Sequence, residues 1–575
     1  ILQFANPHHN HRHIVAITNP LAIMLRLHAK VALALGLSIG ASYAYSENSE
    51  HPRTKNLDVL QPAIVYYEGL SRFMRSVSVG SSVIFDYKTT LGGLEKNDHY
   101  RKLRSEVHQR SAEKMLTLFK INGGVYIKAG QIIASMDHVI PKEYTEIMRV
   151  LQDQAPFGPF ENVERIFMEE FGVPPSQFYK EFDTLPIAAA SLAQVHRARR
   201  RDDGREVAVK VQHPGLKEKS EGDILTISFI SRIVAAFFPE FELQWLVEEF
   251  KRNLPQELNF VLEGHNSERV AANFQNNHKH VYIPKIHWDL TTSRILTMEF
   301  IHGCKVNDLD SLELMNININ EVAKMLAEVF SKQIFLHGFV HSDPHAGNIL
   351  VRPASTPYPL FFPWRRKSIP QLVLLDHGLY RELDEDFRLN YAHLWKAIIM
   401  RDEWEIEHYS NRMNVPKFHI LATMLTSRRH DTLKRGLGNK ATTEEMEFIR
   451  QVGQERAVEI VDTLARIPRQ MLLLLKVNDV LRSVNRDLGA QVNQYPIMAR
   501  HCAKAIYHAN IAQDPRINTV IQNVLMRFQI AWRLWVYLAI HSAQDASASF
   551  AERIGSALFS TKSRIGIKIP PNAAS

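Results

Sequence analysis

Four kinds of side chain occur in an order that could support phosphoryl transfer. That chemistry needs a lysine on the phosphates, a glutamate that orients it, a carboxylate at the nucleophile and oxygen ligands for Mg²⁺. Lys210 ends "VAVK", and Asp343 and Asn348 lie five residues apart in "HSDPHAGN". Asp376 heads "DHG" after the apolar run "LVLL". We expect Lys210 to contact phosphates and Asp343 to orient the attacking hydroxyl or water. Mg²⁺ is expected at Asn348 and Asp376.

The spacing of these residues is informative where the short motifs alone are not. "VAVK" by itself also fits a solvated strand lysine. Asp343 and Asn348, however, have the spacing of the kinase catalytic loop H-R-D-x-x-x-x-N, and Asp376 follows where kinases have D-F-G. Ser342 replaces the usual Arg, which argues against regulation by a phosphorylated activation loop. His345 stands where kinases often carry a lysine.

A metal-binding helix is the alternative interpretation of the same stretch. His337, His341 and His345 fall four residues apart, which is the spacing of one helical face. Pro344 and Gly347 interrupt the helix that such ligation requires. We therefore expect Mg²⁺ at oxygen ligands here, and not a transition metal at the histidines.

These residues must be positioned by helices and strands, and the expected order of those elements indicates the fold. It predicts an α+β, bilobal, protein-kinase-like fold with an N-terminal helical extension and a helix-rich C-lobe. Short alternating runs around Asp203-Gly204 predict a hairpin with Lys210 on its second strand. Helical periodicity marks residues 57–150 and most of the chain beyond 384. The expected segments are a targeting or membrane segment at 1–50, the extension at 51–180, the N-lobe at 181–303, the C-lobe at 304–555 and a tail at 556–575.

The N-terminal segment has an unusual composition. Residues 1–46 contain no Asp or Glu but hold Arg12, Arg26 and Lys30, which is typical of a mitochondrial presequence, with a disordered basic tail as the alternative. Residues 31–45 are apolar but short for a spanning helix, so an inner-membrane anchor stays open. The net charge of +8 over 575 residues does not demand nucleic acid. Two cysteines exclude a disulfide framework.

Further motifs give the chain a specific resemblance. "YIKAGQ" contains K-x-G-Q at Lys128, Gly130 and Gln131, and "AAAS" stands where kinases place a glycine-rich loop. With "ELNFVLEGHN", "HSDPHAGN" and "LLDHG", these motifs span residues 121–380. The chain resembles the UbiB family of atypical kinase-like proteins, also called the aarF-domain family. Two residues make the chain most similar to the aarF-domain-containing kinase 1 subgroup: the histidine of "DHG", and Gly264 in place of the usual Ala.

The resemblance implies further site residues. Glu257 would be the ion-pair partner of Lys210, and Glu263 a second acidic group facing the K-x-G-Q helix. That helix would fold over the active site and regulate it, through Lys128, Gly130 and Gln131. The nucleotide would be bound by the alanine loop and by a hinge that holds adenine: Ala188, Ala189, Ala190, Ser191, Met298, Glu299 and Ile301.

The resemblance also implies a function. We expect an ATP-binding, Mg²⁺-dependent atypical kinase or ATPase of mitochondria. It would act on a small-molecule or lipid substrate in lipid or ubiquinone homeostasis, with membrane association and without nucleic acid. Alanine restricts the close backbone approach that glycine loops give to phosphates, so the site is expected to favour nucleotide binding or slow hydrolysis. A pseudokinase-like, nucleotide-gated scaffold that binds membrane proteins or lipids is the alternative, and a protein-serine/threonine kinase is the third possibility.

Overall fold

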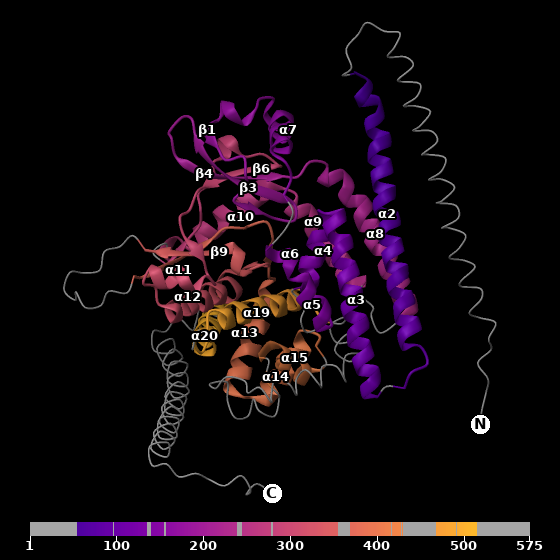
Figure 1. Ribbon diagram of the computed structural model, residues 1–575. Coiled ribbons are helices and arrows are strands. Elements are labelled where there is room, and N and C mark those ends of the chain that lie inside the picture. Colours follow the sequence, from indigo (N-terminus) through magenta and orange to yellow (C-terminus); the bar gives the residue numbers. More distant parts are fainter. Residues whose placement is uncertain are drawn as a thin grey trace, which may run out of the picture.

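The described part of the chain combines three small sheets with an N-terminal group of helices and a C-terminal one. The computed structural model describes residues 55–95, 97–134, 140–153, 157–238, 244–277, 280–354, 368–415, 417–426, 428, 467–489 and 492–513. The strand-rich lobe lies above the helix-rich lobe, and the long helices of the extension run along one side of both (Figure 1). This arrangement confirms the α+β, bilobal fold with a helical extension. The expected targeting or membrane segment at 1–50 and the tail at 556–575 lie outside the described residues.

The extension consists of helices that pack on one another. Asn97 begins α3 by accepting a 2.9 Å hydrogen bond from the backbone N–H of Tyr100. Gly123 ends α3 at a φ of 66°, where a side chain would be strained, and the chain turns directly into α4. The helices are α2 (Lys55–Leu91), α3 (Asp98–Asn122), α4 (Val125–Ala134), α5 (Lys142–Met148) and α6 (Val150–Asp153).

The N-lobe sheet is antiparallel and carries Lys210 on an inner strand. Its order is β1-β3-β4-β6, with β2 paired to β3. The expected hairpin is confirmed as β3 and β4, joined by a turn with Gly204 at a φ of 72°. The bounds are β1 (Tyr179–Phe182), β2 (Ala188–Ala189), β3 (Ala193–Arg200), β4 (Glu206–Gln212) and β6 (Ile295–Glu299).

One face of this sheet packs against helix α7 (Phe160–Phe171). Alternate residues of β4 point to the helix, as a period of two requires, and Val163, Ile166 and Phe167 of α7 meet them. The N-lobe core therefore includes a helix that the expected extension contained. Three helices lie between β4 and β6 in the chain: α8 (Leu216–Phe237), α9 (Gln244–Glu257) and α10 (Phe260–Asn273).

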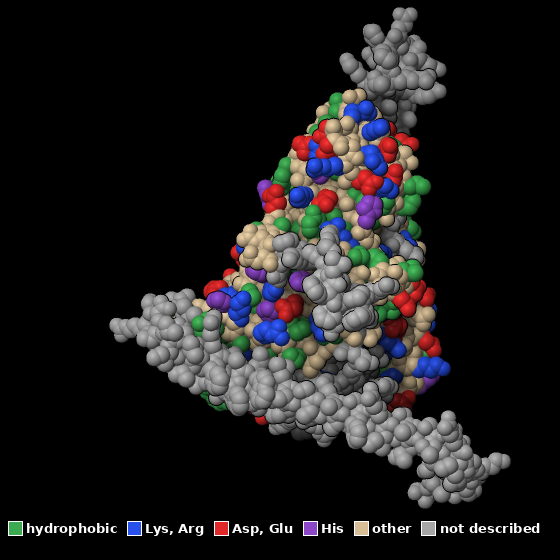
Figure 2. All heavy atoms as spheres, turned by 90° about the vertical axis from the view of Figure 1, so that its left-hand side faces the viewer, with side chains coloured by type: hydrophobic (Ala, Val, Ile, Leu, Met, Phe, Trp, Pro, Cys, Tyr) green, Lys and Arg blue, Asp and Glu red, His purple; other side chains and the backbone are tan. Residues whose placement is uncertain are grey.

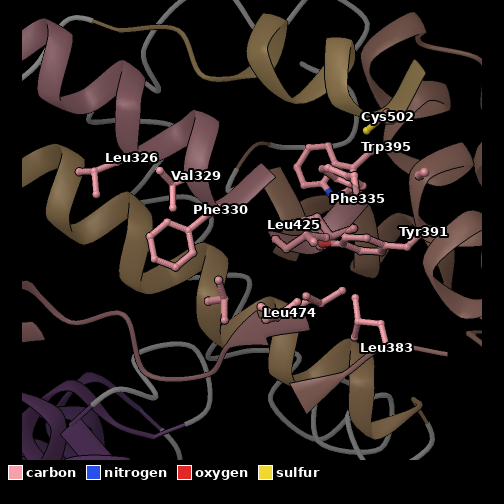
Figure 3. Packing of buried hydrophobic residues seen from close by; sticks show 14 of the residues in the cluster. Leu326, Val329, Phe330, Phe335, Leu383, Tyr391, Trp395, Leu425, Leu474 and Cys502 are labelled. Atoms are coloured by element: carbon pink, nitrogen blue, oxygen red, sulfur yellow. The ribbon is translucent and has the colours of Figure 1, made fainter. Parts of the chain in front are cut away.

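The C-lobe encloses a large apolar core between its helices (Figure 3). Tyr391, Trp395 and Phe335 lie near Leu425 in this cluster. The helices are α11 (Leu309–Leu314), α12 (Ile319–Ser331), α13 (Glu385–Met400), α14 (Glu403–Arg412), α15 (Phe418–Thr426), α19 (Arg469–Asp487) and α20 (Tyr495–Gln513), and a π-helical segment (Lys332–His337) extends α12.

Two strand groups link the C-lobe to the site. β5 (Val281–Tyr282), β10 (Pro370–Leu374), β9 (Ile349–Pro353) and β7 (Cys304–Lys305) form one sheet in that order. β8 (Phe339–His341) pairs with β11 (Tyr380–Glu382). The catalytic-loop stretch joins β8 to β9, and "DHG" joins β10 to β11. The two predicted site motifs are therefore neighbouring loops.

The charge distribution on the visible surface does not indicate a binding face. On the face seen in Figure 2, acidic and basic side chains are interspersed over the described part. The small basic excess of the sequence is not gathered into one area there. Among the described residues, no helix combines the length and the apolar character that a membrane span needs.

Candidate nucleotide and metal site

Lys210 lies on β4 opposite Leu296 of β6 and Val195 of β3. Its ammonium group lies 2.7 Å from Oε1 and 2.9 Å from Oε2 of Glu263 on α10. Asp376 Oδ2 is 3.5 Å away. The Lys210 side chain is largely buried, which opposes its charge, but the carboxylates of Asp376 and Glu263 outweigh burial and raise its pKa. Lys210 is therefore a fixed cation beside Asp376.

The pairing of Lys210 with Glu257 that the resemblance implied is wrong in this structure, because the two glutamates exchange places. Glu257 is the last residue of α9. Asn259 then caps α10 by accepting a hydrogen bond from the backbone N–H of Val261. The helix break turns Glu263 toward Lys210, while Glu257 lies 2.8 Å from Lys128. Glu263 is thus the partner of the strand lysine, and Glu257 is the acidic group that faces the K-x-G-Q helix.

Lys128 connects that helix to the catalytic loop. Its ammonium group lies 3.7 Å from Asp343 Oδ2, in addition to its contact with Glu257. Burial opposes the charge of Lys128, but Glu257 and Asp343 outweigh this effect and raise its pKa. Helix α4 therefore places a cation at the expected nucleophile position, which agrees with an extension that lies over the active site.

The other two K-x-G-Q residues fix the helix and do not enter the site. Gln131 donates a 2.9 Å hydrogen bond from Nε2 to the carbonyl of Leu151 on α6. A Cβ added at Gly130 would lie 2.3 Å from Leu151 Cδ1 and 3.0 Å from Phe119 Cδ2. Gly130 is thus required because the neighbouring side chains approach the helix closely, as expected for a helical glycine with a packing role.

Asp343 and Asn348 are held together within the catalytic loop. Asn348 Nδ2 donates a 3.1 Å hydrogen bond to the backbone carbonyl of Asp343. The amide oxygen of Asn348 is therefore the atom that can act as a ligand. Burial raises the pKa of the Asp343 carboxyl, but the ammonium groups of Lys476 and Lys128 outweigh it and hold this pKa well below its usual range.

The three histidines of this stretch do not share a helical face. His337 ends the π-helical segment, His341 lies on β8 and His345 caps the 3-10 turn Ala346–Asn348. No group of three or more metal-binding His, Cys, Asp or Glu side chains occurs among the described residues. The metal-helix alternative therefore has no support in this geometry.

Asp376 lies directly beside Asn348. The backbone N–H of Leu375 donates a 3.0 Å hydrogen bond to the Asn348 carbonyl, so β10 delivers Asp376 next to the catalytic loop. Asp376 Oδ1 accepts from the Gly378 N–H at 2.9 Å. Burial opposes ionisation of Asp376, but the Lys210 ammonium group, the Gly378 N–H and Lys128 together outweigh it and lower the pKa of this carboxyl. A carboxylate and an amide oxygen are donors that fit Mg²⁺.

His377 preserves the buried ring of the usual phenylalanine and adds hydrogen bonds. Its Nε2 lies 3.1 Å from the Leu374 carbonyl, and its Nδ1 lies 3.1 Å from the Tyr380 hydroxyl. The ring stacks on Tyr380 at 5.6 Å. Burial lowers the pKa of His377 to about 4. The ring is therefore neutral and fixes the turn that follows Asp376.

The alanine loop is a tight hairpin. Ala188 and Ala189 form β2, and the Ala190 N–H donates a 2.7 Å hydrogen bond to the Ala193 carbonyl. None of the loop residues has a positive φ, and Ser191 is buried. Ala189 packs against the cluster around the K-x-G-Q helix. The Ala189 methyl group thus contacts the extension, a contact that glycine lacks.

The expected hinge leads from β6 to the C-lobe sheet. Met298 is buried beside Ala208 of β4. The Glu299 N–H donates a 2.9 Å hydrogen bond to the Lys285 carbonyl, and its carboxylate accepts from the Tyr282 hydroxyl at 2.5 Å. Ile301 is buried in the linker before β7. The segment therefore links β6 of the N-lobe to β7 of the C-lobe sheet.

Burial also acts on the carboxyl group of Glu263, whose side chain is almost fully buried. Burial raises the pKa of its carboxyl to about 7, with Lys210 pulling in the opposite direction. The Phe260 ring lies 5.0 Å from the Lys210 ammonium group and adds a favourable contact for the cation. The pair is thus held by direct hydrogen bonds in a dry setting.

One site residue was not found from the sequence. Lys476 of α19 places its ammonium group 3.1 Å from Asp343 Oδ1. No motif marks it, and it lies far from the catalytic loop in the chain. The available signal is a single charge inside the apolar run "MLLLLKV", which an amphipathic pattern alone does not explain.

The sequence and the structure were compared with known proteins. A family model described as the ABC1 atypical kinase-like domain matches residues 150–410. AarF domain-containing protein kinase 1 of Xenopus laevis is 41% identical over 443 residues, which cover 76% of this chain and 83% of the relative. The mouse protein of that name is 39% identical over 491 residues, covering 84% and 89%.

Two further matches have more limited coverage or similarity. The probable serine/threonine-protein kinase abkD of Dictyostelium discoideum is 41% identical over 453 residues, or 79% of this chain and 64% of the relative. The chain thus spans a little under two thirds of that relative. Among solved structures, the Rv3197–erythromycin complex of Mycobacterium tuberculosis has a TM-score of 0.42 at 19% identity, covering 69% of this chain and 97% of that one.

Proposed function

Because this chain belongs to the ABC1, or UbiB, family of atypical kinase-like proteins, we propose that it is a Mg²⁺-dependent, ATP-binding kinase or ATPase. A kinase-like fold implies nucleotide binding. One observation carries the rest of the proposal. The Lys210 ammonium group, paired with Glu263, lies 3.5 Å from Asp376 Oδ2, and the neighbouring Leu375 N–H is hydrogen-bonded to the Asn348 carbonyl. The proposed phosphate-binding and metal-binding side chains are therefore neighbours of the catalytic loop that holds Asp343.

The proposed roles follow from these contacts. Lys210 binds the phosphates, and Glu263 keeps its ammonium group in place. Asn348 and Asp376 hold Mg²⁺, which when bound neutralises charge on the phosphates. Asp343 orients the attacking hydroxyl or water by accepting its proton.

Turnover of ATP by the purified protein tests this proposal. Asp343→Asn should lower the rate by at least about 100-fold, since a positioned proton acceptor contributes about that much. Asp376→Asn should also lower the rate, because it replaces a carboxylate ligand of the proposed Mg²⁺ site by a neutral amide. A wild-type rate that both variants retain in full means a contaminating activity and refutes the proposal.

We also propose that the acceptor is a small molecule or lipid, in mitochondrial lipid or ubiquinone homeostasis. Helix α4 supports the first part, because Lys128 already lies at Asp343 and restricts the space for a peptide. The acid-free composition of residues 1–46 supports mitochondrial import. The first 50 residues fused to a fluorescent protein should direct it to mitochondria, and replacing Arg12, Arg26 and Lys30 by Gln should abolish this. A fusion that stays cytosolic contradicts the proposal that this segment directs import.

A second candidate is a nucleotide-gated scaffold without phosphoryl transfer. The observation that favours it is that both carboxylate oxygens of Asp343 already receive an ammonium group, from Lys476 and from Lys128. In that case ATP raises the melting temperature of the protein while no ATP is consumed. Measurable turnover that depends on Asp343 excludes the scaffold.

A further inference from the structure

Lys476 is a cation of the site from outside the part of the chain that matches the ABC1 model. That match ends at residue 410, and Lys476 lies on α19 (Figure 1). Its ammonium group contacts Asp343 Oδ1 at 3.1 Å, on the other carboxylate oxygen from Lys128. Two cations from distant parts of the chain thus flank the expected nucleophile position.

Helix α19 holds Lys476 in a fixed place. Leu474 and Val477 are fully buried in the C-lobe core, and Figure 3 shows Leu474 within that packing. Asn478 Nδ2 donates a 3.1 Å hydrogen bond to the Tyr391 hydroxyl. A lysine on a helix anchored on both sides of it is restricted to one region, so its contact with Asp343 is built into the fold.

Stability alone is a weak reason for this contact. The side chains of Lys476 and Asp343 are each 25% exposed, and such partly solvated pairs contribute little, at most about 1 kcal/mol. Lys128 also has Glu257 at 2.8 Å, whereas Asp343 is the only carboxylate that Lys476 contacts among the described residues. When a bound substrate displaces Lys476 from Asp343, no second carboxylate of the described residues pairs with this lysine. Its ammonium group can then bind an anionic group of the ligand.

We propose that Lys476 binds the terminal phosphate of the bound nucleotide. The inference rests on the proposed function, in which the transferred phosphoryl group lies next to Asp343. An ammonium group 3.1 Å from Asp343, on a flexible four-carbon stem, reaches that position. It supplies from α19 the positive charge that kinases often place at the position of His345.

The test compares two nucleotides that differ by the terminal phosphate. Calorimetry in Mg²⁺ gives the dissociation constants of adenylyl-imidodiphosphate, which is not hydrolysed, and of ADP, for the wild type and three variants. Lys476→Met should weaken the triphosphate analogue about 10-fold or more, as loss of a charged hydrogen bond does, and leave ADP within about 2-fold. Lys476→Arg should keep most of the preference for the triphosphate.

Lys324→Met is the matched control, because Lys324 is half-exposed on α12 and pairs with Glu321 of the same helix. It should bind both nucleotides like the wild type. Equal affinities of Lys476→Met and wild type for the analogue overturn the inference, and so does an equal loss for both nucleotides, which indicates a structural role. A wild type that binds neither nucleotide refutes the proposed function and the inference with it, so the two failures are distinguishable.

Discussion

Gly130→Ala should displace the K-x-G-Q helix from the site. The new methyl carbon would lie 2.3 Å from Leu151 Cδ1 and 3.0 Å from Phe119 Cδ2, where an ordinary contact is about 3.5–4.0 Å. Leu151 is fully buried and lies on α6, so it cannot swing into solvent. Relief requires a relative movement of more than about 1 Å between α4 and its neighbours, because a contact of at least about 3.5 Å must be restored.

Two opposing effects set the change in unfolding free energy of Gly130→Ala. Overpacking a buried site costs about 1–3 kcal/mol, and alanine stabilises a helix interior by about 0.5–1 kcal/mol relative to glycine. A net loss of about 1–2 kcal/mol in unfolding free energy is expected. Gly222→Ala on α8 is the control, since an added Cβ there meets nothing within 4 Å, and it should stabilise the protein by about 0.5–1 kcal/mol.

Urea unfolding of the three proteins measures these differences. Because Lys128 lies two residues from Gly130, the same shift should lengthen its 3.7 Å approach to Asp343 and alter nucleotide turnover in Gly130→Ala alone. If Gly130→Ala is as stable as Gly222→Ala, the close packing of α4 on Leu151 is not what the glycine is for.

Three further outcomes follow from particular contacts. Glu263→Gln should weaken ATP binding more than Glu257→Gln in calorimetry, because only Glu263 holds Lys210; the reverse order contradicts the exchanged pairing. Gly264→Ala should lower the unfolding free energy by about 1–3 kcal/mol, since its Cβ would lie 2.6 Å from the Trp288 ring; an unchanged urea midpoint refutes this. Burial lowers the pKa of three histidines away from the site to about 4, so the unfolded chain binds protons that the folded chain does not. These histidines are His108, His337 and His393. The free energy of unfolding should therefore fall as the pH drops from about 6.5 to 4, by up to about 1.4 kcal/mol per pH unit for each group. A urea midpoint that stays constant across that window contradicts this prediction.

Local patterns predicted the fold well where they determine the structure directly. The turn at Asp203-Gly204 and the alternation of β4 placed Lys210 on the second hairpin strand, as observed. Long helical periodicity likewise gave the extension. The assignment of α7 was less direct, because an amphipathic helix does not show which apolar surface it covers, and α7 covers the N-lobe sheet.

The site was predictable only within each motif. The spacing of Asp343 and Asn348 gave their contact, since both lie in one short loop. The partners of Glu257 and Glu263 could not be read from a six-residue separation, because Asn259 starts a new helix between them. Lys476 was missed for a similar reason: its contact with Asp343 spans 133 residues and depends on how α19 packs in the C-lobe.

Nucleotide binding as a function of Mg²⁺ tests the central claim that Lys210, Asn348 and Asp376 form one nucleotide and metal site. The dissociation constant of adenylyl-imidodiphosphate would be measured by calorimetry with and without Mg²⁺, for the wild type and for Asp376→Asn. The account predicts tight binding by the wild type in Mg²⁺, and weakening by at least about 10-fold either on chelation of the metal or in the variant. Binding of equal strength in all four cases, or no binding by the wild type, would contradict it.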